Sequence, residues 1–277
     1  MDLYFEMYSG IAGDMTIAAL LDLGASKDKL IEGINSLGLS NFDLVFDRIK
    51  KNGIDAYNFD VILKGCGHHH DHCHDHDHSH SNDHSHNHKD GHDHHHNHSH
   101  DHVHRNLEAI EKIINSTDLN DNIKKNSLGI FDIIGDSEAK AHGIAKSEVH
   151  FHEVGAIDSI IDIVGTCILL DDLGVENIYF SDLFEGHGYQ MCAHGPMPIP
   201  VPAVANILAD SDISLNFIGE EGEHITPTGA AIVKYFYRKA QESFKIKKIG
   251  LGAGNKDFEK TTNILRVMEI ERDKKKQ

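Results

Sequence analysis

The sequence predicts one compact domain of mixed α and β structure that carries a long, disordered, histidine-rich insertion. The chain has 277 residues, of which 39% are hydrophobic, enough to bury a sizeable core. Outside residues 68–104 the apolar pattern alternates between strand-like and helix-like segments. Residues 68–104 hold 19 of the 25 histidines and almost no apolar side chain. We therefore divide the chain into an N-terminal α/β segment at 1–67, the insertion, and the remainder of the domain at 105–277.

The segment before the insertion predicts a strand, a glycine turn, two helices and a hairpin. The expected elements are a strand at 3–8, a turn at 10–13, a helix at 14–23, a helix after Ser26, and strands at 42–49 and 54–63. Gly24 is a typical helix end, and Ser26 is a typical N-cap. The Asn52-Gly53 pair between two strand-like runs predicts a tight hairpin turn.

The segment after the insertion begins with helices and ends with strands. The expected elements are helices at 106–115, 122–141 and 157–173, strands at 149–152, on both sides of Asp182, at 246–251 and at 264–270, and an extended run at 196–202. A further helix begins near Pro202, and another follows Thr226-Pro227, an N-cap threonine followed by proline at the first helical position. The absence of a repeat of fixed length argues against solenoids and propellers.

Charge and cysteine content narrow the class of protein. With 26 basic and 44 acidic residues the formal net charge is −18, which disfavours binding to nucleic acid and to anionic membranes. No apolar run is long enough for a membrane span, and the N-terminus lacks a signal-peptide pattern. The four cysteines are too few for a disulfide-stabilised secreted domain. We expect a cytoplasmic protein with reduced thiols.

The histidine-rich insertion predicts metal capture. Neutral imidazole is a good ligand for Ni, Zn and Cu, and a flexible chain can offer several imidazoles to one ion. The longest histidine runs are His68, His69 and His70, and His94, His95 and His96. A cloning tag or a solvated linker is the alternative, but the insertion is internal and has aspartates between its histidines.

The densest group of candidate ligands surrounds the start of the helix expected at 157–173. The candidates are His150, His152, Glu153, Asp158 and Asp162. Both histidines would point to the same face of a strand, and the two aspartates, four residues apart, would share a helix face. We interpret this group as a metal site; the alternative is a solvated acidic helix face beside two partly exposed histidines.

A second group lies in the loop expected around residues 186–195. His187 and His194 could each complete a metal site, and Cys192 is a further soft ligand next to His194. Either histidine could instead only contact backbone carbonyls; we favour His194, because Cys192 beside it is another soft ligand.

Three glycine-containing turns could hold a phosphate at a helix start. The first contains Gly10 and Gly13 and precedes Asp14, the second contains Thr226 and Thr228, and the third spans residues 250–256. Each signal is weak, because the sequence contains no Walker A motif and glycine turns are common. Asp14 either stabilises a helix N-terminus or holds a cation that bridges to an anionic ligand.

Six motifs together resemble the LarC family of nickel insertion proteins. They are SGIAGDM, VHFHEVGAIDSIIDIVG, CAHGPMPIPVPA, ITPTGAAI, GLGAGNKD and NILRV, and they span nearly the whole chain around its histidine-rich insertion. The resemblance implies a nickel chelatase of the lyase class. In that family Ni(II) enters pyridinium-3,5-bisthiocarboxylic acid mononucleotide and forms the nickel-pincer cofactor of lactate racemase and related enzymes, in a reaction that consumes CTP.

The resemblance also implies site residues and partners. By motif, the candidates carried over are Asp14, His150, His152, Glu153, Asp158, Asp162 and His194. Longer family members have a C-terminal domain that binds CTP with Mn(II) or Mg(II), and this chain stops before it. The implied partners are the pyridinium mononucleotide, that C-terminal half, and a lactate racemase-type apo-enzyme.

Two other functions remain open at this stage. The first is a nickel store or chaperone in which the insertion is the whole function. The second is a metal-dependent hydrolase that uses the His150-x-His152 pair, although the chain lacks the repeated βα units of a TIM barrel and a Gly-x-Ser-x-Gly motif.

Overall fold

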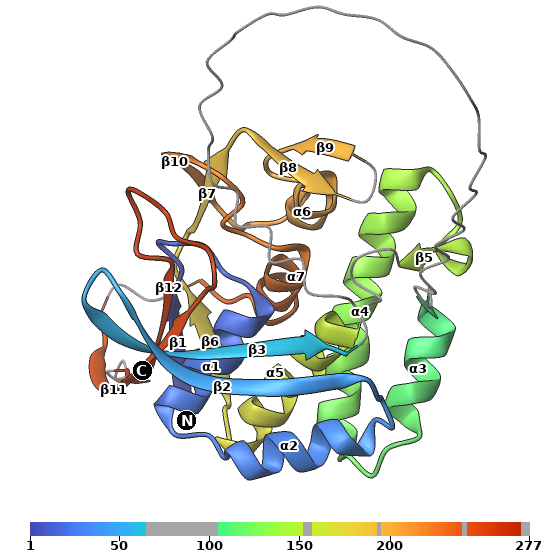
Figure 1. Cartoon of the computed structure of the whole chain (residues 1–277), viewed down its shortest axis with the longest axis horizontal. Coiled ribbons are helices and arrows are strands. Elements are labelled where there is room, and N and C mark those ends of the chain that lie inside the picture. The colour runs from blue at the N-terminus through green and yellow to red at the C-terminus, as the bar shows by residue number, and fades with distance from the viewer. Residues whose placement is uncertain (65–104, 152–156, 193–194, 240–242, 273–277) are drawn as a thin grey trace, which may run out of the picture.

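The computed structural model describes residues 1–64, 105–151, 157–192, 195–239 and 243–272. Within these residues the chain is a mixed α and β protein, which confirms the expected fold class (Figure 1). The histidine-rich insertion and the segments 152–156, 193–194, 240–242 and 273–277 lie outside the described residues.

The main sheet has six strands in the order β2-β3-β11-β12-β1-β6. Their bounds are β1 Asp2–Glu6, β2 Phe42–Lys51, β3 Ile54–Leu63, β6 Asn177–Phe180, β11 Lys245–Ala253 and β12 Ile264–Glu271. Strand β1, next to the edge strand β6, runs antiparallel to β12 and parallel to β6. The β2–β3 hairpin turns at Asn52 and Gly53, both of which have positive φ, as the sequence predicted.

Seven helices occur in the described part of the chain. They are α1 Gly13–Leu23, α2 Lys27–Ser36, α3 Leu107–Asn115, α4 Asp121–His142, α5 Ile157–Asp172, α6 Pro202–Leu208 and α7 Pro227–Phe236. The predicted caps are confirmed at Ser26, whose hydroxyl accepts from the amide of Lys29, and at Thr226, whose hydroxyl accepts from the amide of Gly229. In Figure 1, α3 and α4 lie on the right, away from the main sheet.

Three two-stranded sheets complete the described structure. They are β4 Arg105–Asn106 with β5 His150–Phe151, β7 Leu183–His187 with β10 Leu215–Glu221, and β8 Tyr189–Cys192 with β9 Gly195–Pro198. Strand β10 was missed by the sequence analysis, because its residues do not alternate cleanly between apolar and polar. The β8–β9 hairpin stands above α6 in Figure 1.

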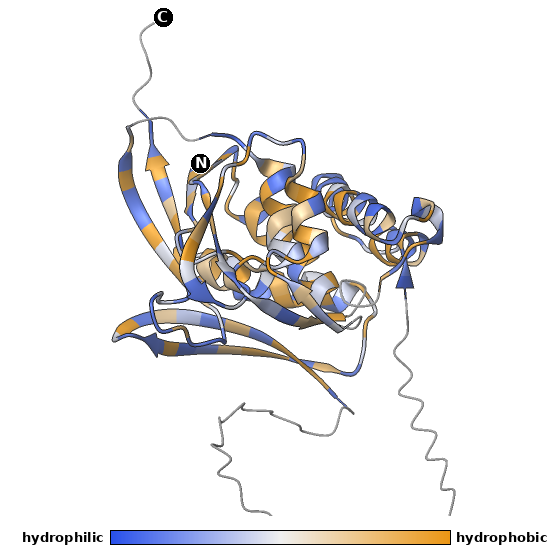
Figure 2. Cartoon of the chain, turned by 90° about the horizontal axis from the view of Figure 1, so that it is seen from above, coloured by the Kyte–Doolittle hydropathy of each residue, from blue (hydrophilic) through white to orange (hydrophobic). Residues whose placement is uncertain are grey.

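The core lies between the main sheet and helices α1 and α5. Both helices are buried on nearly every side, so their sequences are apolar all round rather than amphipathic. In Figure 2 the helices in the middle of the molecule are mostly orange, whereas those at the right edge carry much blue. Among the described helices, none combines the length and apolar character that crossing a membrane requires.

Glycines allow the closest contact in this core. A Cβ at Gly250 would lie 2.2 Å from the carbonyl oxygen of Ala19, and one at Gly252 would lie 2.0 Å from that of Met15. Strand β11 therefore packs directly on the backbone of α1. Two glycines of the third candidate phosphate turn at residues 250–256, Gly250 and Gly252, make this contact, whereas Gly254 lies against Asn263.

Candidate functional site

Aspartates from α1 and α5 meet where the two helices begin. Asp14 lies in the first turn of α1, and Asp158 and Asp162 lie in the first two turns of α5, on the shared face that the sequence predicted. Gly13 is so close to α5 that a Cβ there would lie 2.5 Å from the Cβ and Oδ2 of Asp162. The main-chain amide of Asp14 hydrogen-bonds the Asp162 carboxylate. We call Asp14, Asp60, Asp158 and Asp162 the carboxylate cluster.

Burial and neighbouring carboxylates raise the pKa of Asp14, Asp158 and Asp162. Burial, followed by the charges of Asp60 and Asp158, raises the pKa of Asp14 to about 6. Burial, followed by the charges of Asp14, Asp158 and Asp60, holds the pKa of Asp162 well above its usual value. The pKa of Asp158 is raised by burial and then by Asp60. Because Asp158 is exposed while Asp14 and Asp162 are half-buried, solvent weakens the effect most at Asp158.

Asp60 was not among the residues that the sequence analysis singled out. It lies on β3, close to the end of that strand at Leu63. Its Oδ1 accepts from the amide of Val61 at 2.8 Å. Its charge contributes to the raised pKa of the other three carboxylates. The one available signal was a charged residue beside the apolar end of the strand, which does not by itself say what the residue faces.

Helix geometry partly offsets the repulsion in the cluster. Asp14 accepts a hydrogen bond from the amide of Met15 at 2.7 Å, and Asp158 is hydrogen-bonded by the amide of Ser159. The positive ends of two helix dipoles thus face the negative charges. Among the described residues, no group of three or more His, Cys, Asp or Glu is already arranged to hold a metal ion. His152 and Glu153, which directly precede α5 in the sequence, lie outside the described residues.

His150 lies on the short strand β5, and its side chain is exposed. It pairs with Asn106 of β4. Strand β4 begins at Arg105, directly after the last histidine of the insertion. The structure thus places His150 beside the point where the chain leaves residues 68–104; whether it binds metal stays a prediction.

The first two candidate phosphate turns, before α1 and before α7, contact each other. The amide of Ile11 donates to the carbonyl of His224 at 2.9 Å, and the amide of Thr226 donates to the carbonyl of Ile11 at 3.2 Å. Gly10 packs so closely on this segment that a Cβ would lie 2.0 Å from the His224 oxygen. The amide of Gly10 donates to the carbonyl of Met7.

The threonines of the second turn also have structural contacts. The hydroxyl of Thr226 accepts from the amide of Gly229, and Thr228 is buried. Several polar groups of both turns therefore serve contacts within the protein. Phosphate binding by Gly10, Gly13, Thr226 and Thr228 stays a prediction.

Of the remaining sequence candidates, the structure describes His187 and Cys192. His187 ends β7 and is exposed, and Cys192 ends β8 and is half-buried. His194 lies outside the described residues, as do His68, His69, His70, His94, His95 and His96.

Glu185 and His224 are buried ionisable residues that the sequence analysis missed. Glu185 is 0% exposed on β7, and burial raises its pKa to about 7. The His224 ring stacks on Phe258 with its centroid 3.9 Å away, and its Nδ1 lies 3.0 Å from the carbonyl oxygen of Gly222. Burial lowers the pKa of His224. No sequence signal separates such residues from surface ones, because only the tertiary structure buries them.

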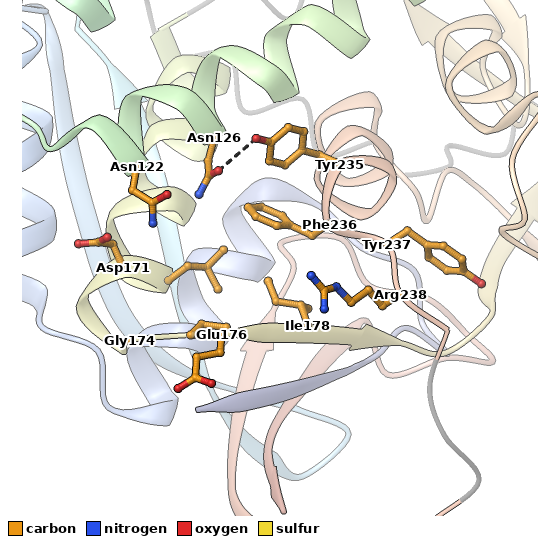
Figure 3. Close-up of a pocket in the computed structure, with 12 residues that line it drawn as sticks. Asn122, Asn126, Asp171, Gly174, Glu176, Ile178, Tyr235, Phe236, Tyr237 and Arg238 are labelled. Carbon is orange, nitrogen blue, oxygen red and sulfur yellow. Dashed lines mark hydrogen bonds between the residues drawn. The ribbon is translucent and has the colours of Figure 1, made fainter. Parts of the chain in front are cut away.

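A cleft of about 460 Å³ lies at the opposite end of α5 from the carboxylate cluster. Figure 3 shows the Phe236 ring between Asn126 and Tyr235 on one side and Ile178 and Arg238 on the other. The Tyr235 hydroxyl donates to Oδ1 of Asn126 at 3.1 Å. A helix rises about 1.5 Å per residue, so the eight residues from Asp162 to Leu170 place the cleft roughly 12 Å along α5 from the nearest carboxylate of the cluster. None of the candidate site residues from the sequence analysis lines this cleft.

The fold and the carboxylate cluster define a mixed α and β protein whose acidic groups converge on the start of two helices. The chain belongs to the nickel insertion protein family, whose model matches residues 3–277. A protein from Alkaliphilus metalliredigens is 47% identical over 97% of this chain, and one from Clostridium acetobutylicum is 48% identical over 96%. Both relatives carry the name pyridinium-3,5-bisthiocarboxylic acid mononucleotide nickel insertion protein.

The chain spans only part of the length of these relatives. This chain covers 60% of the Alkaliphilus protein and 63% of the Clostridium protein. A relative of the same name from Staphylococcus epidermidis is 39% identical over 97% of this chain and 59% of its own length. No solved structure matches the chain.

Proposed function

We propose that this chain delivers Ni(II) to pyridinium-3,5-bisthiocarboxylic acid mononucleotide, and that the carboxylate cluster is where the ion is held. Family membership and the printed names of the relatives support the reaction. The observation that supports the site is the convergence of Asp14, Asp158 and Asp162 at the start of α1 and α5, next to the segment that contains His152 and Glu153.

The raised pKa values of Asp14, Asp158 and Asp162 favour a site that takes up a metal ion and releases it again. Carboxylates that repel one another gain from a bound divalent cation, which neutralises them and displaces their protons. Oxygen and imidazole ligands are harder than the thiocarboxylates of the substrate, so the sulfur atoms would displace them from nickel. The nickel is cargo here, and the protein's part is to gather, orient and release it.

The histidine-rich insertion would supply the ion. Residues 68–104 follow β3, which carries Asp60, and precede β4, which pairs with the strand of His150. One end of the insertion thus follows the strand of Asp60, and the other precedes a strand that pairs with β5, which carries His150. We propose that nickel collected by the imidazoles passes from the insertion to the carboxylate cluster.

The test is nickel titration of a chain that lacks residues 68–104. Replacing His150 and His152 together with alanine, or Asp158 and Asp162 with asparagine, should remove the remaining nickel, whereas Asp118→Asn, at an exposed position between α3 and α4, should not. If both double variants bind as much nickel as the parent, the site lies elsewhere, and His194 becomes the next candidate.

Product analysis separates the three candidate functions. A nickel store would bind the ion only stoichiometrically, and a hydrolase would act without CTP. A chelatase yields the nickel-bound pyridinium mononucleotide. The CTP requirement, with Mn(II) or Mg(II), is proposed to belong to the region present in the longer relatives, of which this chain covers about 60%.

A further inference from the structure

We propose that Glu185 is a positioning residue for the carboxylate cluster, because its buried side chain holds the loop before α7 against the loop before α1. This inference rests on the proposed function of the cluster. Glu185 is fully buried, and a buried carboxylate is unfavourable unless its hydrogen bonds are made.

One oxygen of Glu185 makes these bonds to the main chain. Its Oε1 accepts from the amide of His224 at 2.7 Å and from the amide of Gly186 at 2.8 Å, and the amide of Ile225 also hydrogen-bonds the carboxylate. The other oxygen, Oε2, is buried and has no hydrogen-bond partner within the described structure. The side chain therefore acts through the backbone of residues 224–225.

The same backbone segment is the support of α1. The carbonyl of His224 accepts from Ile11, and Ile11 forms a parallel bridge with Ile225. The segment is thus held by Glu185 on one side and by the loop before α1 on the other. Gly10 allows this contact, since its Cα faces the His224 oxygen without room for a Cβ.

The loop before α1 leads directly into the carboxylate cluster. Ala12 is the N-cap of α1, Gly13 touches Asp162, and Asp14 follows in the first turn. A shift of Ile11 would change the spacing between Asp14 and Asp162. Removing groups that orient the ligands of a metal typically weakens binding by roughly 10- to 100-fold.

The experiment compares Glu185→Ala and Glu185→Gln in the full chain. Glutamine keeps an oxygen acceptor of the same reach, whereas alanine leaves the amides of residues 224 and 225 without one. Nickel bound per chain is measured by equilibrium dialysis, with Asp162→Asn as the reference for loss of the cluster. The histidine-rich insertion is the same in every variant, so differences report on the cluster.

We expect Glu185→Ala to lose the same increment of bound nickel as Asp162→Asn, and Glu185→Gln to restore it. If Asp162→Asn loses nickel but Glu185→Ala does not, the positioning role is wrong while the proposed site stands. If Asp162→Asn loses none, the proposed site fails, and this inference fails with it. A purely structural role would lower thermal stability in Glu185→Ala without the selective nickel loss.

A second variant keeps the test decisive if Glu185→Ala does not fold. Gly10→Ala pushes the same two loops apart from the other side, because its Cβ would lie 2.0 Å from the carbonyl oxygen of His224. It should lose the same nickel increment as Asp162→Asn. A folded Gly10→Ala chain that binds nickel like the wild type would contradict the proposal.

Discussion

Asp162 lies where two helices begin, and its carboxylate is repelled by three neighbours. Burial and the charges of Asp14, Asp158 and Asp60 all raise its pKa. A group whose pKa is higher in the folded than in the unfolded chain binds protons more readily when folded. Its contribution to the free energy of unfolding is fully present at low pH and is lost as the pH rises through the folded pKa.

The upward shift of these pKa values on folding gives a prediction for the stability of the metal-free protein between pH 5 and pH 7. The pKa of Asp14 rises from 3.8 to about 6 on folding, so its charging over this range lowers the free energy of unfolding. Asp2 and Asp172 have lowered pKa values and act in the opposite direction at more acidic pH, and His224, whose pKa is also lowered, acts in the opposite direction near this range in wild type and variant alike. Asp162→Asn should therefore be less sensitive to pH in this range and more stable than wild type at pH 7.

Chemical denaturation at pH 5 and pH 7 in the presence of a chelator measures both effects. The asparagine is nearly the same size and keeps an acceptor for the amide of Asp14. Asp118→Asn, at its exposed loop position, is the control and should follow the wild type. Identical pH dependence in Asp162→Asn and wild type would show that the cluster carboxylates do not repel one another appreciably.

At the scale of elements, helix α1 is the part that joins the sheet to the carboxylate cluster. Its residues Met15 and Ala19 contact β11 through the glycines of that strand, and its start contacts α5 at Asp162. A displacement of α1 on the sheet would therefore also move Asp14. Packing in the core and geometry in the site are linked through this one helix.

Gly252→Ala tests this link. A Cβ at Gly252 would lie 2.0 Å from the carbonyl oxygen of Met15, so the strand or helix must shift, at a cost of about 1–3 kcal/mol in the free energy of unfolding. Gly219→Ala on β10 is the matched control, because its nearest neighbour is a lysine Nζ at 3.8 Å, and it should cost much less. Thermal or denaturant unfolding checks both; equal stability of the two variants would mean that the α1–β11 contact adapts freely.

At the scale of the whole molecule, the strands on either side of the histidine-rich insertion pair with other described strands. Strand β3 pairs with β2 and β11, and β4 pairs with β5, so the elements on either side of residues 68–104 have partners of their own. The insertion itself contains almost no apolar residue to contribute to a core.

Deletion of residues 68–104 should therefore leave the fold intact while lowering the number of nickel ions bound. Circular dichroism and thermal unfolding report on the fold, and metal titration reports on the capacity. Unfolding of the shortened chain would contradict the expectation that the insertion is a loop. An unchanged nickel stoichiometry would place metal capture outside it.

CTP binding provides a second prediction at this scale. The chain carries a net charge of −18, lacks a Walker A motif, and has Gly250 and Gly252 packed on α1. We expect calorimetric titration of CTP with Mn(II) or Mg(II) to show no tight binding by this chain, and nickel insertion to require addition of the remaining region of the longer relatives. Tight CTP binding by the 277 residues would make one of their own turns the nucleotide site.

The sequence by itself determined the fold class, most helices and strands, and the shared face of Asp158 and Asp162. These features depend on local periodicity, on caps such as Ser26, and on the Asn52-Gly53 turn, and each of these is set by residues that are close together in the sequence. The motifs also indicated the family, which the family match confirms.

Only the tertiary structure decided which distant residues meet. Asp60 joins the carboxylate cluster because β3 packs beside α1 and α5, and Glu185 reaches residues 224–225 because β7 lies against the loop before α7. The same holds for Gly252, whose role is to let a strand touch a helix backbone. Such contacts join residues far apart in the chain, and the raised pKa values of the carboxylates depend on burial, which a local sequence pattern does not encode.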